Sequence, residues 1–216
     1  MTAAIHTAQM NRIYRHQRYV YDATRKFFLL GRDRLIERLD AQAGHKVLEI
    51  GCGTGRNLIH AAEYCPEARF FGIDVSTEML TSAIETIERA GQVRRIRVAH
   101  ADATAFDSGR LFAVVKFERI YLSYTLSMIP AWQLALDRAI AMLAPGGELH
   151  IVDFGNQAGL PRWFRTILRR WLDLFHVTPR DYLEIALKAR AKKANATLTI
   201  ERPYRDYAQY ARFRLN

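Results

Sequence analysis

The residues with the clearest chemical potential form a glycine-rich turn at positions 49–55, Glu-Ile-Gly-Cys-Gly-Thr-Gly. Glycine has no Cβ, so such a turn lets the backbone bend sharply and approach a ligand closely. The turn follows the apolar segment 46–50 and precedes a helical pattern that starts near Arg56. Many nucleotide-binding proteins, including dehydrogenases, share this order of elements, so the turn alone predicts a nucleotide-like ligand without identifying it.

Two carboxylates follow the turn at positions where later strands are expected to end. Asp74 comes about twenty residues after the turn, where a carboxylate can accept hydrogen bonds from two ribose hydroxyls. Asp102 follows the third expected strand, where an adenine amino group would lie, and residues 121–127 follow the fourth, at the reacting centre. The plainer alternatives are a helix cap for Asp74 and an ordinary turn residue for Asp102.

Together these segments resemble the motifs of class I S-adenosylmethionine-dependent methyltransferases. Residues 49–55 are similar to the first motif, residues 72–76 with Met79 and Leu80 to the second, Asp102 with Ala103 to the third, and residues 143–147 to the turn before the fifth strand. The resemblance covers about residues 45–155. It implies a Rossmann-like class I methyltransferase fold that binds S-adenosylmethionine and releases S-adenosylhomocysteine, and it disfavours a dehydrogenase.

The same resemblance implies a set of cofactor-binding residues. The backbone at Gly51 and Gly53 would face the methionine portion, Asp74 the ribose and Asp102 the adenine. The full predicted set is Glu49, Gly51, Gly53, Asp74, Val75, Met79, Asp102, Ala103 and Tyr121. A protein that binds S-adenosylmethionine without catalysis would need the same motifs, so this alternative stays open.

The fourth motif, residues 120–124, reads Ile-Tyr-Leu-Ser-Tyr. It lacks the Asp/Asn-Pro-Pro-Tyr pattern of enzymes that methylate exocyclic base nitrogens, and the Pro-Cys nucleophile of cytosine C5 enzymes is also absent. The chain has no recognisable RNA-binding module either. We therefore expect no specific nucleic-acid partner.

The stretch at residues 19–36, together with Arg56-Asn57-Leu58, resembles the bacterial diacylglycerol-homoserine N-methyltransferases of the BtaB type. That resemblance implies successive methylation of the amine of diacylglyceryl-homoserine, which gives the betaine lipid diacylglyceryl-trimethylhomoserine. Phosphatidylethanolamine and quinone methyltransferases remain alternatives. The predicted partner is thus a lipid amine.

Methyl transfer to an amine is an in-line displacement, so the protein must mainly align and desolvate a neutral lone pair. The growing ammonium suits aromatic rings, and a headgroup carboxylate suits a guanidinium. The plainer alternatives are that the tyrosine rings only pack against their neighbours and that the arginines form ion pairs at the surface. On this basis the predicted catalytic residues are Tyr21 and Tyr124, and the predicted substrate-binding residues are Tyr14, Tyr19, Arg25, Arg32 and Arg56.

The elements that must position these residues alternate between short apolar runs and amphipathic stretches, which predicts an α/β fold. We expect a mostly parallel sheet with a C-terminal antiparallel hairpin and helices on both faces. A helical cap at 1–44 would contribute to the substrate site, and 45–216 would form the methyltransferase domain. The expected strands are 46–50, 69–73, 94–99, 117–124, 148–154, 196–202 and 207–214, and the expected helices are 56–64, 76–90, 131–143, 161–175 and 179–193.

The net charge of +10 is distributed unevenly along the chain. Lys plus Arg exceed Asp plus Glu by four in residues 1–44 and by eight in 159–216, whereas 45–158 carry an excess of two acids. The segment 161–175 combines Trp163, Trp171 and four arginines. It predicts a basic amphipathic helix that binds an anionic membrane surface, although a helix with one stripe buried against the sheet is the plain alternative.

Hydropathy and cysteine content limit the expected location of the protein and its possible metal or disulfide chemistry. No apolar run approaches the ~18 residues of a spanning helix, and no signal-peptide pattern precedes the turn. We therefore expect a cytoplasmic protein, associated peripherally with the inner face of the membrane. The two cysteines, Cys52 and Cys65, support neither a disulfide framework nor a cysteine metal site, so no metal is predicted. Cys52 is expected to pack as a small apolar residue, and His150 to be a hydrogen-bonded core residue.

Overall fold

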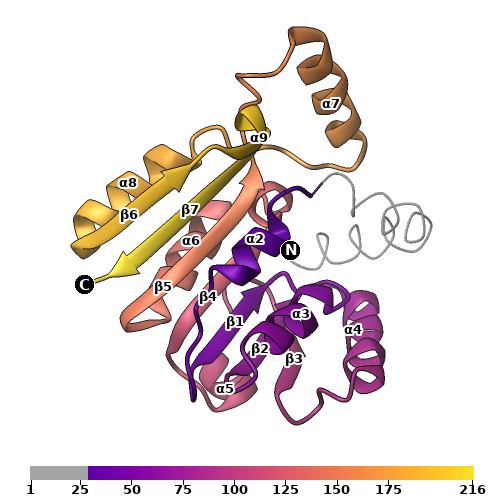
Figure 1. The fold of residues 1–216 in the computed structure, drawn as a ribbon, viewed down its shortest axis with the longest axis vertical. Helices are drawn as coiled ribbons and strands as arrows, with labels where there is room; N and C mark the ends of the chain where they lie inside the picture. Colours follow the sequence, from indigo (N-terminus) through magenta and orange to yellow (C-terminus); the bar gives the residue numbers. More distant parts are fainter. Residues whose placement is uncertain (1–28) are drawn as a thin grey trace.

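Five parallel strands and a C-terminal antiparallel pair form one seven-stranded sheet (Figure 1). The computed structural model describes residues 29–216. The strand order is β3-β2-β1-β4-β5-β7-β6, with β7 antiparallel to both of its neighbours. The strands are β1 (Lys46–Ile50), β2 (Arg69–Asp74), β3 (Ile96–His100), β4 (Phe117–Ser123), β5 (Leu143–Phe154), β6 (Ala196–Glu201) and β7 (Ala208–Leu215). The predicted fold class is confirmed.

Helices cover both faces of this sheet. One face packs against α2 (Arg32–Glu37), α3 (Arg56–Tyr64) and α4 (Thr77–Arg89), and the other against α5 (Ser108–Phe112), α6 (Trp132–Ala141) and α8 (Leu183–Ala194). The short helices η1 (Leu126–Met128) and α9 (Pro203–Asp206) lie in connections. The helix α7 (Arg162–Leu174) stands beyond the sheet, apart from the helices that flank it (Figure 1). Among residues 29–216, no helix is long and apolar enough to cross a bilayer.

The boundaries of the central helices follow from local chemistry. The helix α4 begins at Ser76, whose Oγ accepts a hydrogen bond from the backbone N–H of Met79 at 3.3 Å. It ends before Gly91, which has a φ of 67° that glycine adopts without strain. The helix α3 begins after Gly55, which also has a positive φ, of 78°. These start and stop signals lie in the sequence itself, and both helices were predicted to within a residue or two.

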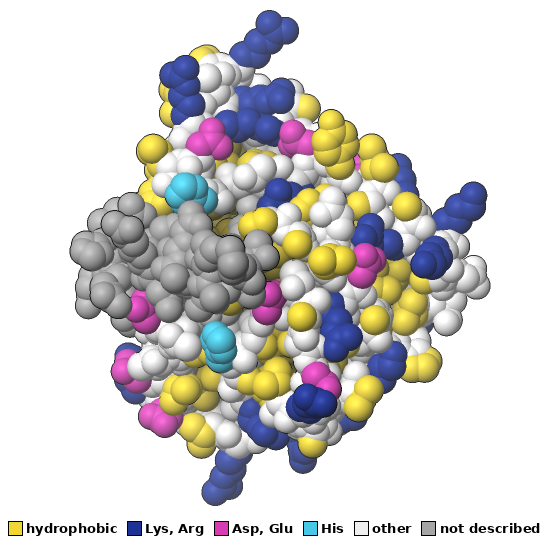
Figure 2. All heavy atoms as spheres, turned by 180° about the vertical axis from the view of Figure 1, so that it is seen from behind, with side chains coloured by type: hydrophobic (Ala, Val, Ile, Leu, Met, Phe, Trp, Pro, Cys, Tyr) yellow, Lys and Arg dark blue, Asp and Glu magenta, His cyan; other side chains and the backbone are white. Residues whose placement is uncertain are grey.

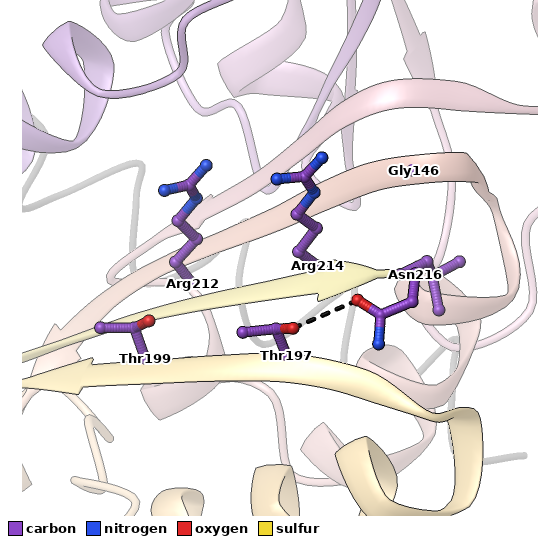
Figure 3. A pocket seen from close by; sticks show the side chains of 7 residues that line it. Gly146, Thr197, Thr199, Arg212, Arg214 and Asn216 are labelled. Carbon is purple, nitrogen blue, oxygen red and sulfur yellow. Dashed lines mark hydrogen bonds between the residues drawn. The ribbon is translucent and has the colours of Figure 1, made fainter.

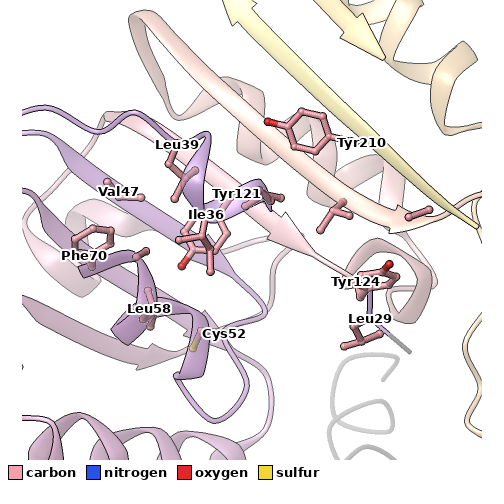
Figure 4. Packing of buried hydrophobic residues seen from close by; sticks show 14 of the residues in the cluster. Leu29, Ile36, Leu39, Val47, Cys52, Leu58, Phe70, Tyr121, Tyr124 and Tyr210 are labelled. Atoms are coloured by element: carbon pink, nitrogen blue, oxygen red, sulfur yellow. The ribbon is translucent and has the colours of Figure 1, made fainter. Parts of the chain in front are cut away.

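Two apolar clusters fill the space between the sheet and its helices. The first lies under α2, α3 and α4 and includes Ile36, Leu58, Phe70 and Tyr121 (Figure 4). Cys52 packs within it as a small apolar residue, as predicted. The second cluster lies under α5, α6 and α8 and takes in the alternate residues of the same strands. The central strands are therefore buried on both faces, as expected for a parallel sheet.

Two expected boundaries were wrong, and three short helices were not predicted. The strand β5 begins at Leu143 rather than at 148, because Pro145-Gly146-Gly147 forms an irregularity within the strand and not a loop before it. The helix α8 begins at Leu183 rather than near 179. The short helices α5, η1 and α9 were not predicted, since each is too brief to show a helical apolar period.

A buried acidic side chain, Glu148, joins β5 to β7 on the face that carries α2. Its two carboxylate oxygens accept hydrogen bonds from Arg212 Nε at 2.7 Å and Nη2 at 2.6 Å. His150 Nε2 lies 3.1 Å from the same carboxylate, and His150 Nδ1 lies 2.7 Å from the Tyr210 hydroxyl. Burial lowers the pKa of His150, so a neutral ring donates to Glu148 and accepts from Tyr210. His150 is thus a hydrogen-bonded core residue, as predicted.

Burial alone would raise the pKa of Glu148. The hydrogen bonds from His150 and Arg212 and the charge of Arg119 outweigh it, and they hold the pKa well below its ordinary value. A carboxyl whose pKa is lower in the folded state stabilises the fold above its unfolded-state pKa, and this contribution is lost as the pH falls through the folded-state pKa. Glu148 therefore stabilises the hairpin at neutral pH and not in strong acid.

We predict that Glu148→Gln lowers the free energy of unfolding by about 2 kcal/mol at pH 7, because it removes the charged acceptor of Arg212 and leaves the mostly buried Arg119 without the carboxylate at 4.0 Å. The measurement is urea denaturation at pH 7 and at pH 3. The matched control is Glu184→Gln, since Glu184 contacts Lys188 and Arg202 but is more exposed. The control should cost less than about 1 kcal/mol. An equal loss in the two variants, or a Glu148→Gln loss that grows in acid, would contradict this assignment.

Candidate functional site

The predicted cofactor-binding residues lie at or near the carboxyl edge of the parallel strands. The register aligns Ile50 with Ile73 and Asp74 with His100, so the ends of β1, β2 and β3 lie side by side. The chain order changes direction between β1 and β4, which pair directly. In open α/β sheets, ligands bind outside the carboxyl ends of the strands at such a switch point.

The glycine turn is folded back onto the end of β2. The backbone N–H groups of Gly51 and Cys52 both donate to the carbonyl oxygen of Ile73, at 2.8 and 3.0 Å. Gly51 has a φ of 75°, and a Cβ at this position would collide with the side chain of Thr125, whose Oγ1 would lie at 2.7 Å. Gly51 is therefore required both by its backbone conformation and by the close approach of the segment after β4.

Asp74 connects the turn to the start of α4. Its Oδ2 accepts a hydrogen bond from the Gly53 N–H at 2.8 Å, and its Oδ1 accepts one from the Ser76 N–H at 2.9 Å. The helix cap itself is Ser76, so capping is not the function of Asp74. This arrangement places a half-buried carboxylate directly beside the glycine turn, where the sequence predicted a ribose-binding group.

Glu49 lies beneath the turn, buried at the end of β1. Its Oε1 accepts a hydrogen bond from Asn57 Nδ2 at 2.9 Å and its Oε2 accepts one from the Tyr121 hydroxyl at 3.1 Å. Burial and the negative charge of Glu49 raise the pKa of Tyr121, and burial raises the pKa of the Cys52 thiol. Tyr121 is fully buried and contacts Glu49 through its hydroxyl. It therefore acts on the turn only by positioning Glu49.

The predicted adenine-binding segment follows β3. Asp102 Oδ1 accepts hydrogen bonds from the N–H and the hydroxyl of Thr104, at 2.8 and 2.7 Å, which closes a local turn. Val75 lies opposite, with its carbonyl oxygen 3.1 Å from His100 Nε2. Ala103 is half-buried beside this turn, whereas the side chain of Met79 is buried. Asp102 is thus the turn residue that the plainer alternative describes. It also lies at the same edge of the sheet as Asp74.

Tyr124, a predicted catalytic residue, follows β4 in the left-handed conformation, with a φ of 55°. Its hydroxyl donates to the carbonyl oxygen of Leu30 at 2.6 Å, and its ring lies against Phe154 with 4.7 Å between centroids. Burial raises the pKa of Tyr124 well above its ordinary value, and the nearby charge of Arg32 opposes this shift. Arg32 therefore lies close enough to Tyr124 to affect it electrostatically, and the Tyr124 hydroxyl already has an acceptor in Leu30.

The remaining predicted substrate residues fall into two groups. Arg56 forms an exposed ion pair with Asp33, with 3.2 Å between Nη1 and Oδ1. This contact is the surface ion pair that was the alternative to substrate binding. Tyr14, Tyr19, Tyr21 and Arg25 lie outside the described residues.

Three contacts at this edge were not predicted from the sequence. Thr125 packs against Gly51, Asn57 binds Glu49, and the buried Asp153 at the end of β5 accepts a hydrogen bond from the Ser127 N–H at 3.0 Å. Burial raises the pKa of Asp153 to about 6. An acidic residue inside the apolar run 149–154 was a signal that could have directed attention to Asp153.

The edge as a whole offers a glycine turn for close approach and two acidic side chains at the ends of adjacent strands. This combination suits a nucleoside with hydroxyl and amino groups to bind. Among residues 29–216, no cluster of three or more His, Cys, Asp or Glu side chains is arranged to hold a metal ion.

Comparison with known proteins gives a consistent result. Residues 47–147 match the family described as a methyltransferase domain. O-methyltransferase rstn1 from Aspergillus nomiae is 32% identical over 66% of this chain and 60% of its own length. Demethylmenaquinone methyltransferase from Listeria welshimeri is 26% identical over 64% of this chain and 56% of its own length. The chain thus spans less than two thirds of the length of these curated relatives.

The fold is also that of solved methyltransferases. Phosphoethanolamine N-methyltransferase 2 from Haemonchus contortus, solved with phosphomonomethylethanolamine and S-adenosylhomocysteine, aligns with a TM-score of 0.71 at 16% identity. The alignment covers 95% of this chain and 60% of that protein. Residues 47–147 therefore match a methyltransferase-domain family, and the chain has the fold of solved methyltransferases.

Proposed function

We propose that the protein is an S-adenosylmethionine-dependent N-methyltransferase that successively methylates the amine of diacylglyceryl-homoserine. The cofactor is supported mainly by the hydrogen bond between Asp74 and the glycine turn at the carboxyl edge of the sheet. The substrate rests on the resemblance of residues 19–36 to the BtaB type, and residues 19–28 of that stretch lie outside the described part.

The residues present fit the cofactor. The glycine turn lets the backbone approach a ligand closely, Asp74 offers a carboxylate for the ribose hydroxyls, and Asp102 lies after β3 for the adenine. When bound, S-adenosylmethionine supplies an electrophilic methyl group. The protein's own contribution is to hold the amine in line with that group and to keep water away from it. Because a neutral amine is already nucleophilic, a dedicated strong base is unnecessary.

The guanidinium groups near this edge suit a headgroup carboxylate. Arg32 lies close enough to Tyr124 to affect its pKa, and Arg56 lies at the first turn of α3, directly after the glycine turn. The ion pair between Arg56 and Asp33 is exposed, so exchanging it for a substrate carboxylate has a low cost. A guanidinium can bind such a carboxylate through two parallel hydrogen bonds.

A second candidate is a quinone methyltransferase, favoured by the similarity to demethylmenaquinone methyltransferase over 64% of the chain. Phosphatidylethanolamine is a third acceptor with the same amine chemistry. A quinone substrate carries no carboxylate, so it gives Arg32 and Arg56 no charged partner. Direct assay of the three acceptors distinguishes these possibilities.

We predict that Asp74→Asn raises the Kd for S-adenosylhomocysteine about tenfold or more, because one charge-assisted acceptor for the ribose is lost. Gly51→Ala should abolish measurable binding, since its Cβ collides with Thr125. Isothermal titration calorimetry measures both effects. The control Glu85→Gln changes an exposed carboxylate on α4 and should bind normally. Unchanged affinity in a folded Asp74→Asn protein would refute the assigned ribose contact.

The acceptor prediction is tested with the purified protein, S-adenosylmethionine and one lipid at a time. We expect mass increases of one, two and three methyl groups on diacylglyceryl-homoserine in mass spectra, and none on demethylmenaquinone. Arg32→Gln should raise the KM for this lipid with a smaller effect on the KM for S-adenosylmethionine, because Arg32 would contact only the headgroup. Methylation of phosphatidylethanolamine or of the quinone, with the homoserine lipid unmodified, would reject the proposed substrate.

The helix α7 supports a membrane-bound substrate. Only part of the apolar face of this helix is buried in the core. Leu168 and Leu172 are buried, whereas the side chains of Trp163 and Ile167 are 66% and 60% exposed. Leu174 lies on the same exposed stripe, one turn after Arg170. The predicted single stripe is thus divided between the core and the surface. Exposed tryptophan and aliphatic side chains beside arginines suit the interface of an anionic bilayer.

The other positive charges on the molecule are less concentrated. On the face turned away from the view in Figure 1, lysine and arginine side chains project from several separate places rather than from one patch (Figure 2). Arg169 is also paired, with 2.7 Å between its Nη2 and Asp181 Oδ1. Membrane binding therefore depends mainly on the exposed stripe of α7 and its remaining exposed arginines, Arg162, Arg165 and Arg170.

We predict that the protein sediments with vesicles that contain phosphatidylglycerol, less with phosphatidylcholine alone, and less at high salt. The double variant Trp163→Ser with Ile167→Ser should lose at least about tenfold in vesicle affinity, because two exposed apolar anchors are removed. The matched control is Leu134→Ser, an equally exposed leucine on α6. Equal sedimentation of the double variant and the parent protein would exclude α7 as the binding element.

A further inference from the structure

A pocket of about 230 Å³ opens on the C-terminal hairpin, on the face of β6 and β7 opposite α8 (Figure 3). Two arginines of β7 and two threonines of β6 face it side by side, as paired residues of neighbouring strands. Its lining residues are Gly146, Thr197, Thr199, Arg212, Arg214, Leu215 and Asn216.

This pocket is separate from the glycine turn. The strand register aligns Val47, Arg119, Glu148, Arg214 and Thr197 in one row across the sheet. Val47 lies near the start of β1, whereas the glycine turn follows the end of β1. The pocket therefore lies toward the amino edge of the parallel strands and does not depend on the proposed methyl-transfer function.

Positive charge is in excess around the pocket. Glu148 receives two hydrogen bonds from Arg212, while Arg119 Nε and Arg214 Nε lie 4.0 and 3.9 Å from its carboxylate. Asp40 is a further acidic group near Arg212. The charged side chains that line the pocket itself are Arg212 and Arg214, both positive, and His150 beside Glu148 is neutral because burial lowers its pKa. An anion placed here would meet a favourable potential.

Glu148 does not require Arg214. The two hydrogen bonds from Arg212 already occupy both carboxylate oxygens, and the longer Arg214 contact leaves that side chain 57% exposed. Arg212 is held in a fixed orientation by its Nε and Nη2, so its Nη1 is the nitrogen left for another acceptor. Hydroxyl groups lie beside both arginines, since Thr199 pairs with Arg212 and Thr197 with Arg214.

We propose that this pocket binds a phosphate group. Guanidinium groups and hydroxyls are the side-chain donors that phosphate oxygens prefer, and a pre-oriented arginine loses less entropy when it binds. The Thr197 hydroxyl now lies 3.2 Å from Asn216 Oδ1, a contact at the surface that a phosphate oxygen could replace. Gly146 has no atom within 4 Å of the place where its Cβ would lie, so the rim on that side is open.

The test is a titration of the whole protein with inorganic phosphate at constant ionic strength, followed by two-dimensional amide NMR. We expect saturable shifts confined to residues near 146, 197–199 and 212–216. A parallel arm compares sedimentation with phosphatidylcholine vesicles that do or do not contain phosphatidic acid. The first arm reports a free phosphate compound as the source, and the second reports a lipid headgroup.

Arg214→Gln should raise the Kd about tenfold in whichever arm shows binding, because one charged donor is lost. The variant should fold normally, since Arg214 is exposed and its contact with Glu148 is long. Thr199→Val provides a second, uncharged change with a smaller expected effect. The matched control is Arg110→Gln, which removes an exposed arginine on α5 far along the chain from the pocket.

Saturable binding that Arg214→Gln weakens and Arg110→Gln does not weaken supports the site. If phosphatidic acid binds in this way and inorganic phosphate does not, the phosphate comes from a lipid. Linear or scattered shifts with phosphate, together with vesicle binding that is indifferent to Arg214, overturn the proposal. Equal loss in Arg214→Gln and Arg110→Gln also overturns it, because only general electrostatic attraction would then remain.

Discussion

The buried carboxylate of Glu49 constrains the site more than any other group. A buried charge must be satisfied by hydrogen bonds, and Asn57 of α3 and Tyr121 of β4 each donate one. These two bonds join β1, the helix after the glycine turn and the neighbouring strand at one point. The turn lies directly above, folded onto Ile73 and held to Asp74 through the Gly53 N–H. The conformation of the ligand-facing backbone therefore depends on a group that need not touch the ligand.

A second buried carboxylate, Glu148, has a comparable role at the other end of the sheet, with a different consequence. It requires positive partners, and the C-terminal hairpin supplies them through Arg212 and, at longer range, Arg214. Part of the positive charge of residues 159–216 is thus neutralised by acidic side chains of the same chain. Arg190, for instance, pairs with Asp137. Net charge alone therefore overstates the anion-binding surface. The exposed arginines of α7 and of the hairpin pocket are what remains for external partners.

The sequence predicted the fold well because its signals are local. The apolar run at β1, the Ser76 cap and Gly91 act within a few residues, and the corresponding elements lie where they were expected. Interactions between distant segments were not predictable in this way. Nothing near Thr125 indicates that it packs against Gly51, and nothing near Asp153 indicates its contact with the Ser127 backbone. The roles of the motif residues stay predictions, whereas the contacts that hold those residues in place were not predicted at all.

Tyr124 shows how the distant contacts bear on function. Its ring type suggested contact with an ammonium, yet its hydroxyl donates to Leu30 and its ring packs on Phe154. These contacts hold the segment before α2 against the end of β4, next to the charge of Arg32. A residue placed in this way fixes the segment that borders the end of β4. In the proposed function, acceptor specificity resides in that segment, because residues 19–36, which resemble the lipid N-methyltransferases, include it.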